Sequence, residues 1–216
     1  MKRKRSKQWI GLFSAVSVVA ACSSAPVTEL VAGVSTQVQV PKELRSIEVS
    51  VKAGGQTSYC QHFDVVQGKV QLPKTLGVNK EHDNIPVTIS IIGYTNDSAD
   101  LNDARSDCPD DPTMPSGFSD SQVVLNARVV RRSIQTYRDD HIAFVPMPLR
   151  FACFDQTCAT GANVGSMTCK AGACVDANID SATLVDYNDD LVFGTANTCF
   201  SPLKCLADAQ APAIID

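Results

Sequence analysis

Cysteines are the residues of this chain whose number and spacing specify chemistry most clearly. Eight of the nine follow residue 50: Cys60, Cys108, Cys153, Cys158, Cys169, Cys174, Cys199 and Cys205. An even count in an oxidising compartment predicts four disulfides. We expect one between Cys60 and Cys108, and three within the cluster from Cys153 to Cys205. The alternative is a zinc site at the first four cysteines of the cluster, but their four-residue spacers lie at the edge of the range that zinc prefers.

The ninth cysteine, Cys22, ends a segment built like a secretory leader. A basic stretch (Lys2, Arg3, Lys4, Arg5 and Lys7) precedes a short apolar run, Ile10–Ala21. Twelve residues rise about 18 Å as a helix, which is too short for a hydrocarbon core of about 30 Å. The pattern therefore favours a cleaved signal over a permanent membrane span.

The end of this leader, Val19-Ala20-Ala21-Cys22, resembles the processing box of bacterial lipoproteins. The resemblance implies cleavage between Ala21 and Cys22 and attachment of acyl chains such as palmitate to Cys22. It predicts a lipid-anchored envelope protein. Ser23, in place of an aspartate, favours the outer membrane. The alternative is an ordinary signal peptide with a chance cysteine.

Charge excludes one class of partner. The leader holds five of the 19 Lys and Arg and none of the 23 Asp and Glu, so its removal changes the formal charge from −4 to −9. An acidic body argues against binding to nucleic acid.

A long acidic connection, residues 95–119, offers the main candidates for a Ca²⁺ site, with Asn188, Asp189 and Asp190 as weaker ones. Asp97, Asp100 and Asp103 recur at every third position, and carboxylates of a loop are ligands that Ca²⁺ prefers. Asn96–Asp107 lacks the glycine of a tight calcium loop, so we expect a solvated acidic loop and no cofactor, with a Ca²⁺ site as the alternative. Cys108 would pin this loop to the body, which makes it the expected partner-binding surface.

No pattern of catalytic residues is present. The three histidines, His62, His82 and His141, lie in no Gly-x-Ser-x-Gly or His-Glu-x-x-His motif. Only a forced interpretation joins Asp140 and His141 to Ser133 as a triad. We therefore expect a protein that is not an enzyme.

Two surface patterns leave alternatives open. The arginines Arg128, Arg131, Arg132 and Arg138 form the one basic patch. We expect them to pair with Asp139 and Asp140, the alternative being a site for an anionic polysaccharide or a lipid headgroup. Glycan binding would need exposed aromatic platforms, for which the candidates are Tyr94, Tyr137 and Tyr187.

Alternating apolar residues indicate the fold. Seven short runs alternate apolar and polar residues or are otherwise typical of strands, at 38–40, 47–51, 58–63, 70–72, 87–92, 123–129 and 142–151. Gly54 and Gly55 predict a turn after the second run. They predict a mainly β chain, an antiparallel sandwich of Ig-like or transthyretin-like type. The expected organisation is a signal peptide (1–21), a lipidated tether (22–34), the sandwich (35–151), a cysteine-rich region (152–205) and a flexible tail (206–216).

The segment 142–176 resembles a group of functionally uncharacterised, cysteine-rich exported lipoproteins of myxobacterial type. The match rests on Pro148, Leu149, Cys153, Cys158, Thr168, Cys169, Gly172, Cys174, Val175 and Asp176, and is extended by Leu184 and Tyr187. The resemblance implies a β-domain joined to a cysteine-rich region, and it implies no reaction. We expect a structural or protein-binding role in the envelope. The alternatives are a Ca²⁺-dependent or glycan-binding module and, last, an envelope enzyme.

Overall fold

The computed structural model describes residues 27–66, 69–80, 84–116, 123–159 and 164–194. Its strands are β1 (Glu29–Thr36), β2 (Ser46–Ala53), β3 (Gln56–Asp64), β4 (Lys74–Asn79), β5 (Val87–Tyr94), β6 (Ala127–Gln135), β7 (Ile142–Leu149), β8 (Met167–Lys170) and β9 (Ala173–Asp176). The helices are α1 (Ser98–Ala104) and α2 (Asp190–Phe193), with 3-10 turns at Phe151–Cys153, Val164–Ser166 and Ser181–Thr183. Within these residues, none of the helices has the length and apolar character needed to cross a bilayer.

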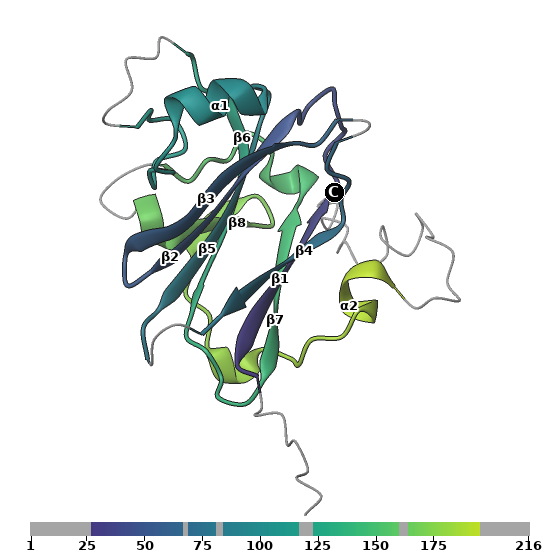
Figure 1. Ribbon diagram of the computed structural model, residues 1–216. Helices are drawn as coiled ribbons and strands as arrows, with labels where there is room; N and C mark the ends of the chain where they lie inside the picture. Colours follow the sequence, from purple (N-terminus) through teal and green to yellow (C-terminus); the bar gives the residue numbers. More distant parts are fainter. Residues whose placement is uncertain (1–26, 67–68, 81–83, 117–122, 160–163, 195–216) are drawn as a thin grey trace, which may run out of the picture.

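Two sheets pack face to face (Figure 1). One has the order β4-β1-β7 and the other β3-β2-β5-β6. All neighbours are antiparallel except β1 and β7, which run parallel. Gly54 and Gly55, both at positive φ, form the predicted turn between β2 and β3. The prediction of a mainly β sandwich is confirmed.

The core lies between the sheets because alternate residues of each strand face inward. Ile47, Val49 and Val51 of β2 meet side chains such as Leu30 and Val145 from the other sheet. These side chains are at most 6% exposed. The opposite, outer face of the four-stranded sheet carries buried polar side chains such as Ser46, Glu48 and Ser90, together with a small apolar cluster of Ile92, Tyr94 and Val130.

Four sequence predictions are wrong at the level of elements. The predicted tether ends too late, because β1 begins at Glu29 and buries Leu30, Ala32 and Val34 in the core. A strand was expected at 38–40, but these residues lie in the irregular connection between β1 and β2. A strand was also expected at 70–72, but the strand is β4, which begins after Pro73. The acidic connection contains a helix, α1, whose Leu101 and Ala104 are buried.

The C-terminal region is a small hairpin held by two disulfides. Cys153, in the 3-10 turn after β7, pairs with Cys169 of β8, and Cys158 pairs with Cys174 of β9. These pairings leave the four thiols unavailable for a zinc site. Cys199 and Cys205 lie outside the described residues, as do the predicted leader, Cys22 and the tail.

Candidate functional site

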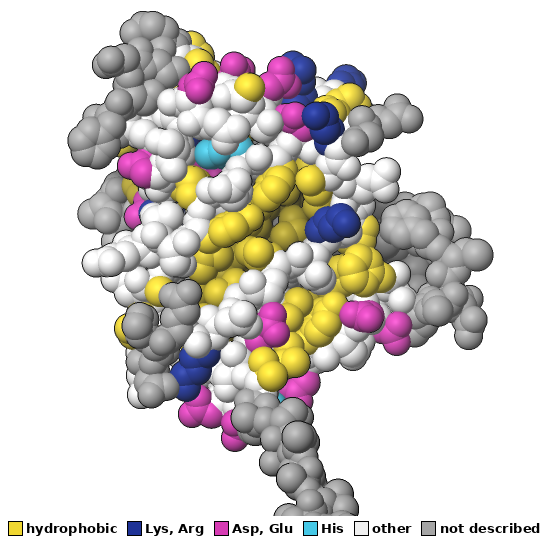
Figure 2. Space-filling model, in the orientation of Figure 1, with side chains coloured by type: hydrophobic (Ala, Val, Ile, Leu, Met, Phe, Trp, Pro, Cys, Tyr) yellow, Lys and Arg dark blue, Asp and Glu magenta, His cyan; other side chains and the backbone are white. Residues whose placement is uncertain are grey.

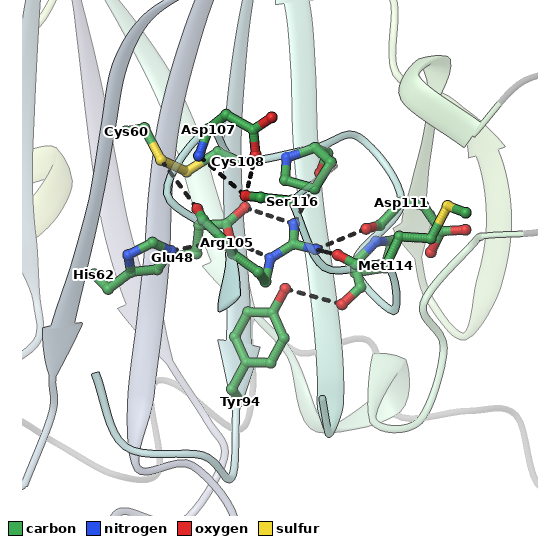
Figure 3. A network of polar contacts seen from close by, with 12 residues as sticks. Glu48, Cys60, His62, Tyr94, Arg105, Asp107, Cys108, Asp111, Met114 and Ser116 are labelled. Carbon is green, nitrogen blue, oxygen red and sulfur yellow. Dashed lines mark hydrogen bonds and ion pairs between the residues drawn. A yellow bond between two sulfur atoms is a disulfide. The ribbon is translucent and has the colours of Figure 1, made fainter. Parts of the chain in front are cut away.

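The acidic segment that follows β5 folds onto the outer face of the four-stranded sheet. At its centre, the fully buried Arg105 donates two hydrogen bonds to Glu48 of β2 (Figure 3). Arg105 Nε donates to Glu48 Oε2 at 2.6 Å, and Nη2 donates to Oε1 at 3.1 Å. The ring of His62, on β3, places Nε2 at 3.2 Å from Glu48 Oε2 and Nδ1 at 2.9 Å from Asn102 Oδ1 of α1. We call Glu48, His62 and Arg105 the buried triad.

Arg105 also determines the path of the segment after α1. Its guanidinium donates to the carbonyl oxygens of Pro109, Asp111 and Met114. Buried carbonyl groups need partners, and one side chain here supplies three of them. The hydroxyl of Tyr94, from β5, donates to the carbonyl oxygen of Pro112 at 3.0 Å. The segment is therefore held by side chains of the sheet and of its own helix.

A disulfide and a second arginine extend this attachment. The predicted Cys60–Cys108 disulfide is confirmed, and it joins the segment to β3. Arg132 of β6 donates to the carbonyl oxygen of Asp110 and, on the other side, to those of Val164 and Met167. Arg132 thus links the acidic segment to the cysteine-rich region.

The electrostatics of the buried triad are those of a structural clamp. Burial alone would raise the pKa of Glu48, but hydrogen bonds from His62 and Arg105 and the charge of Arg105 hold this pKa below its usual value. Burial opposes the charge of Arg105 as well, yet the hydrogen bond with Glu48 raises its pKa. Burial raises the pKa of Tyr94 well above its usual value. These groups are bonded to one another and to the segment that covers them.

The structure separates the metal candidates that the sequence suggested. Asp97 precedes α1 and pairs with Arg45 at 2.7 Å. Among the described residues, ligand atoms of at least three His, Cys, Asp or Glu side chains converge only at Cys60, His62 and Cys108. Both sulfurs of that group belong to the disulfide. Asp97, Asp100 and Asp103 form no such group.

The arginine patch is divided among different partners, and the predicted pairing with Asp139 and Asp140 is wrong. Arg128 pairs with Asp155 at 2.8 Å, and Arg138 lies 3.4 Å from Asp186. Arg131 donates to the hydroxyl of Thr168 and the carbonyl of Cys169 in the hairpin. Arg132 donates to the carbonyl oxygens of Asp110, Val164 and Met167. Asp139 pairs with Lys80 instead. The arginines bond to groups that come close only in the folded chain.

The remaining catalytic and glycan candidates are also dispersed. His141 Nδ1 lies 2.9 Å from Asp186, whereas Ser133 is buried and donates to Gln135 within β6. Tyr94 is fully buried and offers no platform. Tyr187 packs against Phe144, with its hydroxyl on Asp189. Tyr137 lines the groove described next.

An apolar groove opens between β3 and β4, on the side where the two sheets do not join. Figure 2 shows hydrophobic side chains gathered across the middle of this face. The groove has a volume of about 280 Å³ and is lined by Val51, Ala53, Ser58, Tyr59, Leu76, Gly77, Val78, Asn79, Ile85, Val87 and Tyr137. None of these side chains is charged. We call it the β3–β4 groove.

The sequence pointed to neither the buried triad nor the β3–β4 groove. One signal for the triad was available, since Arg105 is the only basic residue between Asp97 and Asp111. No comparable signal marks the groove, because its walls come from strands that are distant in sequence. Searches of protein-family models, curated proteins and solved structures found no match to this chain.

Proposed function

We propose that this chain is a lipid-anchored cell-envelope protein with a non-enzymatic role, and that it binds a protein partner through the β3–β4 groove. The observation that carries the proposal is the lining of the groove, which is mainly apolar, includes polar groups of Ser58, Asn79 and two tyrosines, and has no charged side chain. Apolar concavities with a few polar groups are typical of binding sites. The groove replaces the acidic segment as the expected binding surface, because that segment is docked onto the sheet by Arg105 and Cys108.

The anchor follows from the sequence around Cys22, and the fold adds a limit on distance. Only six residues separate Cys22 from Glu29, where β1 begins. An extended chain advances at most about 3.6 Å per residue, so these seven steps reach about 25 Å. A lipid on Cys22 would hold the sandwich close to the membrane, with the start of β1 directed toward it. Asn79 pairs with Glu29 there, so the same end of the groove would face the bilayer.

Photo-crosslinking in whole cells tests the binding role. A photoreactive phenylalanine analogue at Tyr59 would lie in the groove, and the same analogue at Val124, which is 74% exposed, is the matched control. We expect a cross-link to one envelope protein from position 59 and none from position 124. Equal cross-linking from both positions, or none from either, would overturn the proposal.

The anchor is tested separately with Cys22→Ser. We expect this variant to incorporate no labelled palmitate and to remain soluble or unprocessed with the same fold. If the variant were still membrane-bound with its leader removed, the lipoprotein assignment would be wrong.

A further inference from the structure

We infer that the partner enters the β3–β4 groove as an extended, uncharged segment that adds a strand to the outer edge of β4. This inference rests on the proposed function and specifies its binding mode. Addition of a peptide strand to a sheet edge is a recurrent mode of recognition, in which the backbone gives affinity and alternate side chains give specificity. The argument starts from the edges of the two sheets.

The other strand edges of the sandwich are covered or interrupted. The β3 edge is interrupted by a register shift opposite Val51 and Lys52, and its Asp64 carbonyl accepts the N–H of Val70. Beside β6, Ile134 exchanges backbone hydrogen bonds with Ala177 and Ile179. β7 is covered by hydrogen bonds that Val185 and Tyr187 make with it. Its Pro146 and Pro148 also lack the N–H that a further strand would need. Coverage and proline are devices by which proteins protect sheet edges.

The outer edge of β4 has no such protection among the described residues. Its strand neighbour is β1 alone. Lys80 N–H donates to Thr28 O, on the β1 side. Because backbone groups alternate along an antiparallel pair, those of Thr75, Gly77 and Asn79 point to the open edge. The hydroxyl of Tyr137 donates to the carbonyl oxygen of Asn79 at 2.8 Å. The edge-facing N–H and C=O groups of Thr75 and Gly77 therefore remain for a partner strand.

The side chains specify what kind of segment fits. Leu76 and Val78 face the core and line the groove beside this edge. An added strand would present every second side chain to the same groove. Since the lining has no charge, a buried charge of the segment would lack a partner there, which is costly. The segment is therefore uncharged, with apolar residues at alternate positions.

A synthetic probe tests the inference on the lipidated full-length protein in detergent. The probe is a capped seven-residue peptide that alternates serine and valine, and its control carries N-methyl groups on alternate amides. We expect the probe to bind and to slow hydrogen exchange at the amides of Thr75 and Gly77. The N-methyl peptide that blocks the paired amides should bind at least tenfold more weakly.

Matched variants separate strand addition from simple occupation of the groove. Of the backbone hydrogen-bonding groups, Thr75→Pro removes the edge-facing N–H, whereas Thr75→Val keeps it with a similar shape. We expect at least a tenfold loss of affinity for the first and little change for the second. Equal binding to both, with Leu76→Ser weakened, would overturn strand addition and leave groove binding intact. If Thr75→Pro did not fold, the two peptides would decide.

Two further outcomes also overturn the inference. Failure of the probe to bind the unaltered protein would exclude strand addition by such a segment, while the cross-link from Tyr59 would still decide the proposed function. Protection of the Thr75 and Gly77 amides without any peptide, together with a dimer in sedimentation, would show that a second copy occupies the edge.

Discussion

The outer face of the four-stranded sheet and the β3–β4 groove differ in how far the rest of the chain covers them. The outer face carries charged and polar side chains beside an apolar cluster of Ile92, Tyr94 and Val130, and the chain covers it with the acidic segment, the buried triad and a disulfide. The groove is lined mainly by apolar side chains, and the described residues leave it open. Exposed apolar surface is unfavourable in water, and the chain covers the apolar cluster of the outer face but not the groove. An open apolar surface points to function.

The largest loss of stability should come from removing Arg105 from the buried triad. Arg105→Ala leaves Glu48 buried without its cation, and we expect a loss of about 3–5 kcal/mol in the free energy of unfolding. Arg45→Ala is the control, since Arg45 pairs with Asp97 while both side chains are about half exposed. It should cost less than about 1 kcal/mol. Urea unfolding measures both, and similar values would show that the triad does not hold the segment.

Removal of the Cys60–Cys108 disulfide should come next. Its cysteines are 48 residues apart, against 16 for Cys153–Cys169. The chain-entropy model gives about 4 kcal/mol for the first and about 3 kcal/mol for the second. In the double serine variant of Cys60 and Cys108, hydrogen exchange should accelerate in residues 95–116 and stay unchanged in β4. Equal acceleration in β4 would remove the contrast between the two regions.

A pH titration tests the same clamp with a smaller perturbation. The folded pKa of Glu48 lies below its ordinary value of 4.5. Its stabilising contribution is therefore complete above that value and is lost as the pH falls through the folded pKa. The melting temperature of the unaltered protein should fall more steeply below pH 4.5 than that of Glu48→Gln. Parallel curves would contradict the role assigned to Glu48.

The smallest change in stability is expected in the groove. Leu76→Ser removes a partly buried side chain beside the open edge and should cost about 1 kcal/mol. It should nevertheless abolish the cross-link formed from Tyr59. Val124→Ser, at an apolar position that is 74% exposed, should change neither property. A loss of stability as large as that of Arg105→Ala would mean that the groove belongs to the core.

Local patterns predicted the parts of the fold that depend on neighbouring residues. The alternation at Ile47–Val51 and the glycine pair at 54–55 predicted a strand and a turn, and both are present. The cysteine spacing predicted the Cys60–Cys108 disulfide. By contrast, β1 was taken for a tether, because its alanine and glycine dilute the apolar pattern. It is a central strand, paired on both sides with β4 and β7.

Composition and short-range spacing were enough to predict a mainly β chain, the likeness of its leader to a lipoprotein signal, and the acidic charge. Which polar groups are buried in contact with one another, and which apolar groups stay exposed, depends on how distant strands pack. Glu48 and Arg105 are 57 residues apart, and the two walls of the groove come from different sheets. Contacts of that range are set by the register and packing of the strands, which a local pattern does not encode.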